Sequence, residues 1–432
     1  MLILAANQIL ILSKISAALY VKILLSFFLT VFYLFYNLNP LTHKQVSEKL
    51  TKLGACYDIL FSAGLLFLVQ TLIYIGLLTF YPVHWIIFLT TLILSLLTGY
   101  LLVINGLIRS FAVSRQMSLF FRILLLSFWW MPFVNSIFSL VAAEKIKSEL
   151  IFDRDKVLLN QSREQQNICQ TKYPLVMVHG IFFRDWEIFN YWGRIPAELE
   201  ANGAQVFYGE HESSLPVETS AEQLREKILE ILAKTGAQKV NIIAHSKGGI
   251  DSRYAIACLG LAPYVASLTT INTPHYGSDL AGKMLSMTPK KIVTSIGKQY
   301  SKLFTRLGDG DCDFVGSINE LTPERCIELN AKMPDNAAVM YQSVGSSMAS
   351  RRSAPFPLSL GYSIIHPIGG DNDGLVATKS MRWGNFLGII KPAGKVGISH
   401  GDMIDLSRKN IKGFDVTEFY VKLVSDLKAK GL

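Results

Sequence analysis

Long apolar stretches dominate the first third of the chain, whereas the remainder alternates short apolar runs with polar segments. Four stretches reach the roughly 20 apolar residues that cross a hydrocarbon core. They cover residues 15–38, 56–80, 84–108 and 119–141. One such stretch can be a buried core helix, but four in succession predict an all-α transmembrane domain of four helices over residues 1–142. The first stretch lacks the basic start and the small-residue cleavage site of a signal peptide, so we interpret it as retained.

A different pattern follows a polar connector at residues 143–170. Runs typical of strands, at 205–208, 240–244, 265–271 and 339–344, are separated by helical stretches such as 221–234. This alternation predicts a mostly parallel sheet with helices on both faces, in one domain over residues 171–432. Residues 283–325 interrupt it, with apolar positions at helical spacing among lysines. Two interpretations remain for this segment: surface helices, or a lid over an apolar pocket.

The formal net charge of +9 does not indicate a nucleic-acid partner. Residues 1–142 hold eight Lys or Arg and two Asp or Glu, so +6 of the excess lies beside the apolar stretches. Basic residues follow the first stretch (Lys44, Lys49, Lys52) and the third (Arg109, Arg115). The positive-inside rule makes these loops cytoplasmic, and an even number of spans then places the second domain outside the cytoplasmic membrane.

Other basic residues fit this topology less well. Lys14 and Lys22 near the start, and Lys145 and Lys147 after the fourth stretch, argue against it without reversing it. Arg122 lies inside the fourth stretch, where it either extends to the interface or is a functional intramembrane charge.

The sequence Ala-His-Ser-Lys-Gly-Gly, residues 244–249, follows a β-branched run and reads as a nucleophile elbow. In this turn Ser246 is exposed between a strand and a helix, and small residues at Ala244 and Gly248 let the turn close. Such a short pattern also arises by chance, as a strand-to-helix turn with a capping serine. Its context therefore decides between the two interpretations.

The context contains an oxyanion-hole loop. A strand-like run ends at residue 178 and is followed by His179, Gly180 and Ile181. In this arrangement the backbone N–H groups of Ile181 and Lys247 bind the negative charge that develops on the substrate oxygen. Both donors belong to the main chain, so the side chain of Lys247 matters little to this role.

A serine nucleophile needs a histidine base and an acid that orients it. His400 lies in a loop of small residues near the C-terminus, after a turn-rich segment that contains Asp371 and Asp373. The chain order Ser246, Asp373, His400 is the order of α/β-hydrolases and differs from the orders of chymotrypsin and subtilisin. We therefore predict these three residues as a catalytic triad that requires no cofactor for its chemistry.

These motifs together resemble the bacterial triacylglycerol lipases of the Pseudomonas and Burkholderia type. The similar stretches are 174–180, 239–254, 267–278 and 372–376, well under half of the chain. The resemblance implies an α/β-hydrolase fold and favours Asp373 over Asp371 as the triad acid. It also implies a structural calcium ion, for which Asp402 occupies one ligand position. The segment 343–370, which should supply a second aspartate, contains no acidic residue. This argues against calcium and leaves the metal undetermined, with Asp402 as the candidate ligand.

The resemblance also implies a disulfide in this half of the chain, for which Cys312 and Cys326 are candidates by position. Four cysteines in this half allow three complete pairings, and the sequence does not choose among them. We predict a membrane-anchored serine hydrolase that cleaves carboxylic esters of acyl lipids, with the bilayer and a lipid or ester as its partners. Alternatives are a phospholipase or acyltransferase on the same scaffold, and a non-catalytic membrane protein that retains the fold.

Overall fold

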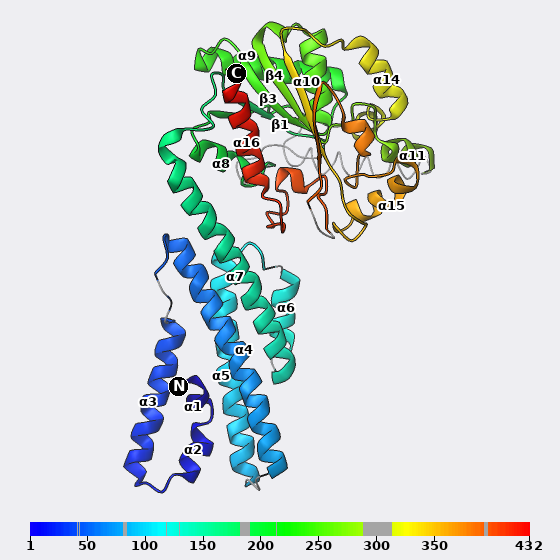
Figure 1. Ribbon diagram of the computed structural model, residues 1–432. Helices are drawn as coiled ribbons and strands as arrows, with labels where there is room; N and C mark the ends of the chain where they lie inside the picture. The colour runs from blue at the N-terminus through cyan, green and yellow to red at the C-terminus, as the bar shows by residue number, and fades with distance from the viewer. Residues whose placement is uncertain are drawn as a thin grey trace. The chain divides into compact units, whose positions relative to one another are not determined.

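The computed structural model describes the chain except for residues 41, 43, 81–83, 118, 129, 182–190, 213, 288–312 and 393–395. The chain divides into two compact units, Met1–Ser162 and Arg163–Leu432. Both are drawn in Figure 1, and each is described here by itself.

Within the described residues, all secondary-structure elements of unit 1, Met1–Ser162, are helices. Its helices are α1 (Leu2–Ala6), α2 (Gln8–Lys14), α3 (Leu19–Leu38), α4 (Glu48–Phe80), α5 (Trp85–Val113), α6 (Leu119–Ser127) and α7 (Pro132–Arg163). Within the described residues, α3, α4 and α5 are long and apolar enough to cross a membrane. They match the first three predicted stretches.

The fourth predicted stretch, residues 119–141, does not form one spanning helix. Helix α6 ends at Ser127, and a separate helix α7 begins at Pro132. Proline suits the first turn of a helix, where its missing N–H is not needed, but it interrupts a helix interior. The prediction of four spanning helices, made from hydropathy alone, is therefore corrected to three candidate spans and a broken segment.

The predicted connector, residues 143–170, is mostly helical. Helix α7 continues without interruption to Arg163, so the two compact units meet between Ser162 and Arg163 and not at residue 142 or 170. Arg163 already belongs to the second unit, where its guanidinium pairs with Glu418 at 2.7 Å.

Unit 2, Arg163–Leu432, is built on a six-stranded parallel sheet of order β2-β1-β3-β4-β5-β6. The strands are β1 (Leu175–Val178), β2 (Val206–Tyr208), β3 (Val240–His245), β4 (Val265–Ile271), β5 (Met340–Ser346) and β6 (Asn385–Ile390). The helices are α8 (Ile195–Ala201), α9 (Val217–Thr235), α10 (Lys247–Cys258), α11 (Asp279–Met287), α13 (Phe314–Asn319), α14 (Pro323–Lys332), α15 (Leu358–Gly369) and α16 (Val416–Ala429). This arrangement confirms the predicted parallel α/β fold.

Alternating side chains of the strands form two hydrophobic cores, one on each face of the sheet. In β3, Ile243 joins α8 and α16 on one face, whereas Ile242 and Ala244 join α9 and α10 on the other. Because both faces are covered, β1, β3 and β4 are buried at every position. The polar members of β3 and β4 include Asn241 and Ser267, which pair with each other at 2.7 Å. The carboxyl ends of these central strands carry the candidate site.

Candidate active site

Ser246 makes the turn between β3 and α10 by itself, since β3 ends at His245 and α10 begins at Lys247. Its φ of 54° and ψ of −131° are values that residues with a side chain rarely adopt. Such strain persists only where the surroundings enforce it, and it is typical of a nucleophile elbow. The predicted turn is therefore present.

Glycines allow the backbone to close around this turn. A Cβ atom on Gly180 would lie 2.7 Å from the Cβ of Ser246, and one on Gly248 would overlap the carbonyl oxygen of His179. The loop after β1 and the first turn of α10 therefore meet at Ser246 only because both positions lack side chains. The two N–H groups predicted for the oxyanion hole, those of Ile181 and Lys247, belong to these two segments.

His400 and Asp373 form a closely coupled pair. The distance from His400 Nδ1 to Asp373 Oδ2 is 2.6 Å, and the backbone N–H of His400 donates to the carbonyl oxygen of Asp373 at 2.8 Å. The other carboxylate oxygen of Asp373 accepts the N–H groups of Leu375 and Val376 at 2.9 and 2.8 Å. Both side chains are buried, with 8% and 0% exposed. The carboxylate thus has one orientation, which fixes the imidazole.

Asp371, the other candidate acid, points elsewhere. Its carboxylate forms a surface ion pair with Lys391 at 2.9 Å, and the two side chains are 53% and 50% exposed. It has no contact with His400 among the interactions of the described residues. The geometry therefore favours Asp373 as the partner of His400.

Tyr191 and His245 connect His400 to the loop at Gly180. The hydroxyl of Tyr191 lies 2.6 Å from His245 Nδ1 and accepts the N–H of Gly180 at 3.1 Å. The ring of His245 lies 4.5 Å from that of His400, centre to centre. Burial lowers the pKa of His245 well below its usual value, and the neighbouring His400 lowers it further. A neutral ring therefore lies beside the predicted base.

The side chain of Lys247 enters a second network, in the first turn of α10 after the elbow. Its ammonium group is fully buried and donates to both carboxylate oxygens of Asp251, at 2.8 and 3.0 Å, and to Ser220 Oγ at 3.1 Å. A positive charge at a helix N-terminus is unfavourable, and Asp251, one turn later on α10, compensates it. The side chain of Lys247 is thus held by two specific partners. This was not expected from the sequence, which assigned a role only to the backbone N–H of Lys247.

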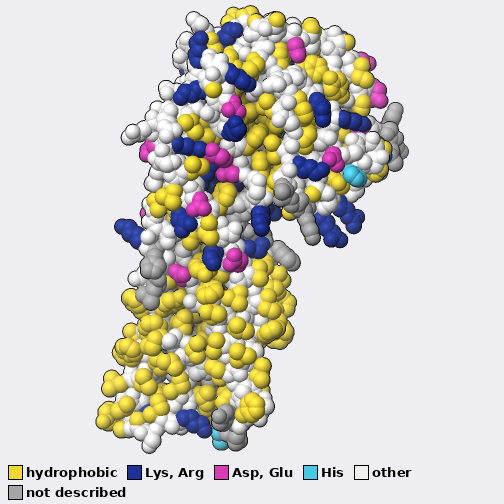
Figure 2. Space-filling model, in the orientation of Figure 1, with side chains coloured by type: hydrophobic (Ala, Val, Ile, Leu, Met, Phe, Trp, Pro, Cys, Tyr) yellow, Lys and Arg dark blue, Asp and Glu magenta, His cyan; other side chains and the backbone are white. Residues whose placement is uncertain are grey.

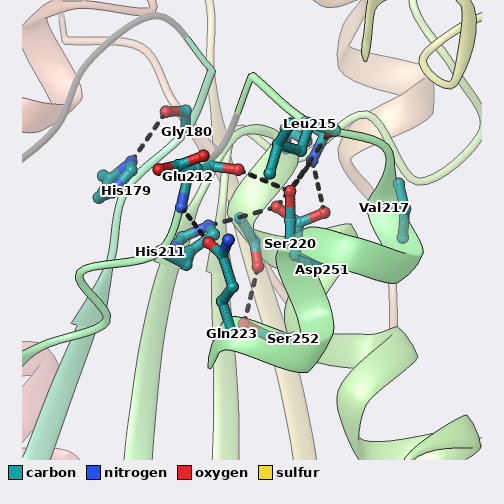
Figure 3. A network of polar contacts seen from close by, with 12 residues as sticks. His179, Gly180, His211, Glu212, Leu215, Val217, Ser220, Gln223, Asp251 and Ser252 are labelled. Atoms are coloured by element: carbon teal, nitrogen blue, oxygen red, sulfur yellow. Dashed lines mark hydrogen bonds and ion pairs between the residues drawn. The ribbon is translucent and has the colours of Figure 1, made fainter. Parts of the chain in front are cut away.

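The same network reaches the loop that carries Gly180. His211 Nε2 lies 3.4 Å from Asp251 Oδ2, and the His211 ring stacks on that of His179 at 4.5 Å with an interplanar angle of 18°. His179 Nδ1 lies 3.1 Å from the carbonyl oxygen of Gly180. Figure 3 shows these residues between the β-strand ends and α10. Two networks therefore converge on Gly180, one through Tyr191 and one through His179.

Sequence reasoning did not single out three of these residues: Tyr191, His211 and Asp251. The spacing of Asp251 four residues after Lys247 on a predicted helix was a readable signal for an ion pair. Tyr191 and His211 meet the site only through tertiary packing, with partners 54 and 40 residues away in the chain, so no local pattern indicated them.

The residues near Asp402 do not fit a calcium ion. Asp402 Oδ2 accepts the N–H and the hydroxyl of Ser399 at 2.9 and 2.6 Å, and burial raises the pKa of this carboxyl. The neighbouring Asp405 uses both carboxylate oxygens to bind the guanidinium of Arg194 at 2.7 and 2.8 Å. Within the described residues no group of three or more potential His, Cys, Asp or Glu ligands comes together. An internal ion pair and hydrogen bonds stabilise this loop instead.

Two other predictions fall wholly or partly outside the described residues. Most of the predicted lid, residues 283–325, lies in the segment 288–312. Cys312 lies there too, and Cys326, the partner that its position suggested, is a free cysteine in the structure, so the predicted disulfide between them is not formed. The thiol of Cys326 is buried next to the carbonyl oxygens of Glu320 and Pro274, and burial raises its pKa to about 12.

Comparison with known proteins assigns the class. Residues 174–308 match the family described as "Putative serine esterase (DUF676)". A triacylglycerol lipase of Vibrio cholerae is 30% identical over 246 residues, which cover 52% of this chain and 78% of that lipase. A triacylglycerol lipase of Burkholderia plantarii is 33% identical over 177 residues, covering 38% of this chain and 49% of that lipase. The crystal structure of the Bacillus licheniformis lipase BlEst2 in its mature form matches 59% of this chain and 92% of its own, with 22% identity and a TM-score of 0.44.

The protein is an ester hydrolase of the α/β-hydrolase class. More narrowly, the chain belongs to the bacterial triacylglycerol lipase family, as the predicted resemblance implied.

Proposed function

We propose that this protein is a membrane-anchored lipase or esterase that uses Ser246, His400 and Asp373 as its catalytic triad. The observation that carries the proposal is the coupling of His400 to a fully buried Asp373 at 2.6 Å, next to a strained serine turn. The relatives named triacylglycerol lipase support acyl esters of lipids as the substrate class.

In this mechanism the Ser246 hydroxyl attacks the ester carbonyl while His400 Nε2 accepts its proton. The carbonyl oxygen becomes an oxyanion, which the N–H groups of Ile181 and Lys247 stabilise. Collapse of this intermediate forms the acyl-enzyme, and the alcohol leaves with the proton from His400. Water, deprotonated by His400, then releases the fatty acid and restores Ser246.

The surroundings of the triad suit this cycle. His400 becomes a cation twice in each turnover, and Asp373 lies in contact with Nδ1 to stabilise it. The neighbouring His245 stays neutral because it is buried, so it adds no repulsive charge. The residues named here complete the chemistry without a cofactor.

Three apolar helices of unit 1 support membrane anchoring: α3, α4 and α5. Their outward side chains include Phe27, Leu38 and Leu78, which are 67%, 79% and 73% exposed. Figure 2 shows hydrophobic side chains gathered over this part of the chain. Large apolar surfaces of this kind are stable in a bilayer and unfavourable in water.

A covalent label tests the proposed nucleophile. A fluorophosphonate probe should modify the full-length protein, and Ser246→Ala should remove both the label and the hydrolysis of acyl esters. Ser252→Ala, a substitution on the next turn of α10, is the matched control and should retain both. Labelling of the Ser246→Ala protein at wild-type level contradicts the proposal. Lipid products released by wild type and Ser246→Ala would then identify the acyl and alcohol parts.

A further inference from the structure

Helices α6 and α7 form a hairpin that does not cross unit 1. Helix α6 has nine residues, about 14 Å of helix at 1.5 Å per residue, against the roughly 30 Å of a hydrocarbon core. It folds back against the first part of α7, where the rings of Phe121 and Phe128 pack on that of Phe138 at 6.0 and 5.6 Å. Figure 1 shows α6 beside this part of α7.

The first turns of α7, which form the tip of this hairpin, lie beside the middle of α4. The hydroxyl of Ser136, in the second turn of α7, donates to the carbonyl oxygen of Gly64 at 2.9 Å. Gly64 is halfway along the 33-residue α4, and the side chain of Leu140 packs directly on it. Helix α7 therefore begins in the middle of the helical unit.

From this tip α7 runs back towards the start of α4. A Cβ atom on Gly54 would touch Leu150 at 4.0 Å, and Asp153 pairs with Lys49 in the first turn of α4 at 2.7 Å. Residue numbers rise along α7 as they fall along α4, so the helices are antiparallel. The last turns of α7 thus lie at the end of the unit where α4 begins.

The start of the hairpin lies at the same end. Arg122 of α6 donates to the carbonyl oxygens of Ser110 and Ser114, where α5 ends. Glu149 of α7 accepts the hydroxyl of Ser114 at 2.6 Å and the N–H of Arg115 at 2.8 Å. The hairpin therefore enters and leaves at the end where α5 finishes.

The end of α3 also lies at this end of unit 1, because Arg109 of α5 donates to the carbonyl oxygen of Leu38 at 2.7 Å. We call this end of unit 1 the basic end. It carries seven basic residues beside the apolar helices: Lys44, Lys49, Lys52, Arg109, Arg115, Lys145 and Lys147. The opposite end, where α3 begins, carries Lys14 and Lys22.

Since the chain leaves unit 1 from the basic end, we propose that the hydrolase unit lies on the cytoplasmic side of the membrane, where it acts on esters reached from the cytoplasmic leaflet. The positive-inside rule makes the basic end cytoplasmic. The same rule gave the extracytoplasmic location expected from four spans, and the broken fourth stretch reverses it. Lys145 and Lys147, which opposed the earlier topology, now agree with the other basic residues.

This inference rests on the proposed membrane anchoring, which is tested first. The full chain should stay in the membrane fraction after alkaline carbonate treatment. If carbonate releases it, anchoring fails and the topology falls with it, whereas the proposed triad is unaffected.

Single cysteines in the full chain test the topology itself. In a variant whose five cysteines are replaced by serine, Ser16→Cys marks the opposite end, Val46→Cys the basic end and Gln165→Cys the start of unit 2; all three positions are exposed. An impermeant maleimide should label Ser16→Cys in intact cells. It should label Val46→Cys and Gln165→Cys only after permeabilisation. Labelling of Gln165→Cys in intact cells overturns the proposal.

Protease accessibility of the unsubstituted protein provides a second measurement if the cysteine variants fold poorly. Protease added to inverted membrane vesicles should digest the hydrolase unit, and the same protease added to right-side-out vesicles should leave it intact. The reverse pattern overturns the proposal. Neither measurement depends on Ser246 being the nucleophile, so a failed topology and a failed triad give different results.

Discussion

Both units of this protein have apolar cores, but they differ in the side chains that they expose and in where their buried polar groups lie. In unit 1 polar groups pair in the interior, as Asn7 and Gln70 do through two hydrogen bonds of 2.7 and 2.9 Å, while leucines and phenylalanines cover the outside. In unit 2 two apolar cores line the sheet, and the buried polar groups gather at the strand ends around Ser246. This difference is what the proposed anchoring requires, with hydrocarbon around α3 to α5 and water around the hydrolase unit.

Buried polarity consequently has different purposes in the two units. Under the proposed function, it satisfies groups in unit 1 that hydrocarbon cannot solvate, whereas in unit 2 it holds the proposed catalytic groups in position. Substitutions that remove one buried partner should therefore affect catalysis in unit 2 and only assembly in unit 1. The following predictions, from the largest expected effect to the smallest, test this contrast.

The largest effect should come from Asp373→Asn. His400 loses the carboxylate that orients Nδ1 and stabilises its cation, so kcat on a soluble ester should fall by about 10³ to 10⁴. Asp371→Asn is the matched control, because that carboxylate forms only an exposed pair with Lys391, and it should remain within about twofold of wild type. Severe loss in Asp371→Asn with mild loss in Asp373→Asn would reassign the acid.

Asp251→Asn should destabilise unit 2 by about 3–5 kcal/mol, because it leaves the buried ammonium of Lys247 without its counter-charge. Denaturant unfolding of the full chain, followed through loss of ester hydrolysis, measures this change. Asp426→Asn removes the partner of Lys422 in an exposed pair of the same i, i+4 spacing, and it should cost less than about 1 kcal/mol. Equal effects of the two substitutions would show that the network beneath the elbow contributes no more than a surface pair.

A pair of glycine substitutions compares the two units directly. A Cβ on Gly248 overlaps the backbone oxygen of His179, which cannot move without shifting the Gly180 loop, so Gly248→Ala should lower kcat at least about tenfold. A Cβ on Gly106 of α5 meets Cγ and Cδ2 of the buried Leu60 side chain, both at 2.7 Å, so its cost falls on helix packing within unit 1. Gly106→Ala should therefore leave kcat within about twofold. A larger loss in Gly106→Ala would mean that helix packing in unit 1 controls the site.

The most gradual effect, small for each step in pH, should be a dependence of stability on pH that originates in unit 2. Burial lowers the pKa of His245 and of His275 well below the usual 6.5, so the folded state keeps both neutral while the unfolded chain binds protons below that pH. Stability should be complete above about pH 6.5 and fall at lower pH by about 1.4 kcal/mol per pH unit for each histidine.

Thermal unfolding between pH 8 and pH 5 measures this effect. Substitution of His275 by Gln should reduce the slope, whereas His366→Gln, at an exposed position of α15, should leave it unchanged. A stability that stays constant over this range would contradict the assignment of buried neutral histidines.

The sequence predicted unit 2 well for a physical reason. Parallel strands covered on both faces are rich in apolar and β-branched residues, so β3 and β4 stand out in the sequence as short runs of this kind, and the elbow directly follows one of them. The pair of Asp373 and His400 could also be found, because chain order restricted the candidates. Tyr191 and His211 could not, since their contacts depend on how distant loops pack.

Unit 1 was predicted less accurately because hydropathy measures how apolar a stretch is and not whether it forms one continuous helix. Residues 119–141 are apolar enough to span, yet they form α6 and the start of α7 on either side of a break. Pro132 was the readable signal for that break. Reading it as a helix start would have changed the number of spans and, with it, the inferred side of the hydrolase.

The close approach of Gly180, Gly248 and Gly249 to their neighbours constrains how this lineage can vary. Any side chain at these positions meets another backbone or side-chain group within 3 Å: the Cβ of Ser246, the carbonyl of His179 or the side chain of Thr273. In a saturation-mutagenesis library selected for hydrolysis, these glycines should tolerate as few replacements as Ser246, although they perform no chemistry. Protein abundance distinguishes the two kinds of intolerance, because Ser246 variants should accumulate normally and glycine variants should be depleted by cellular proteolysis.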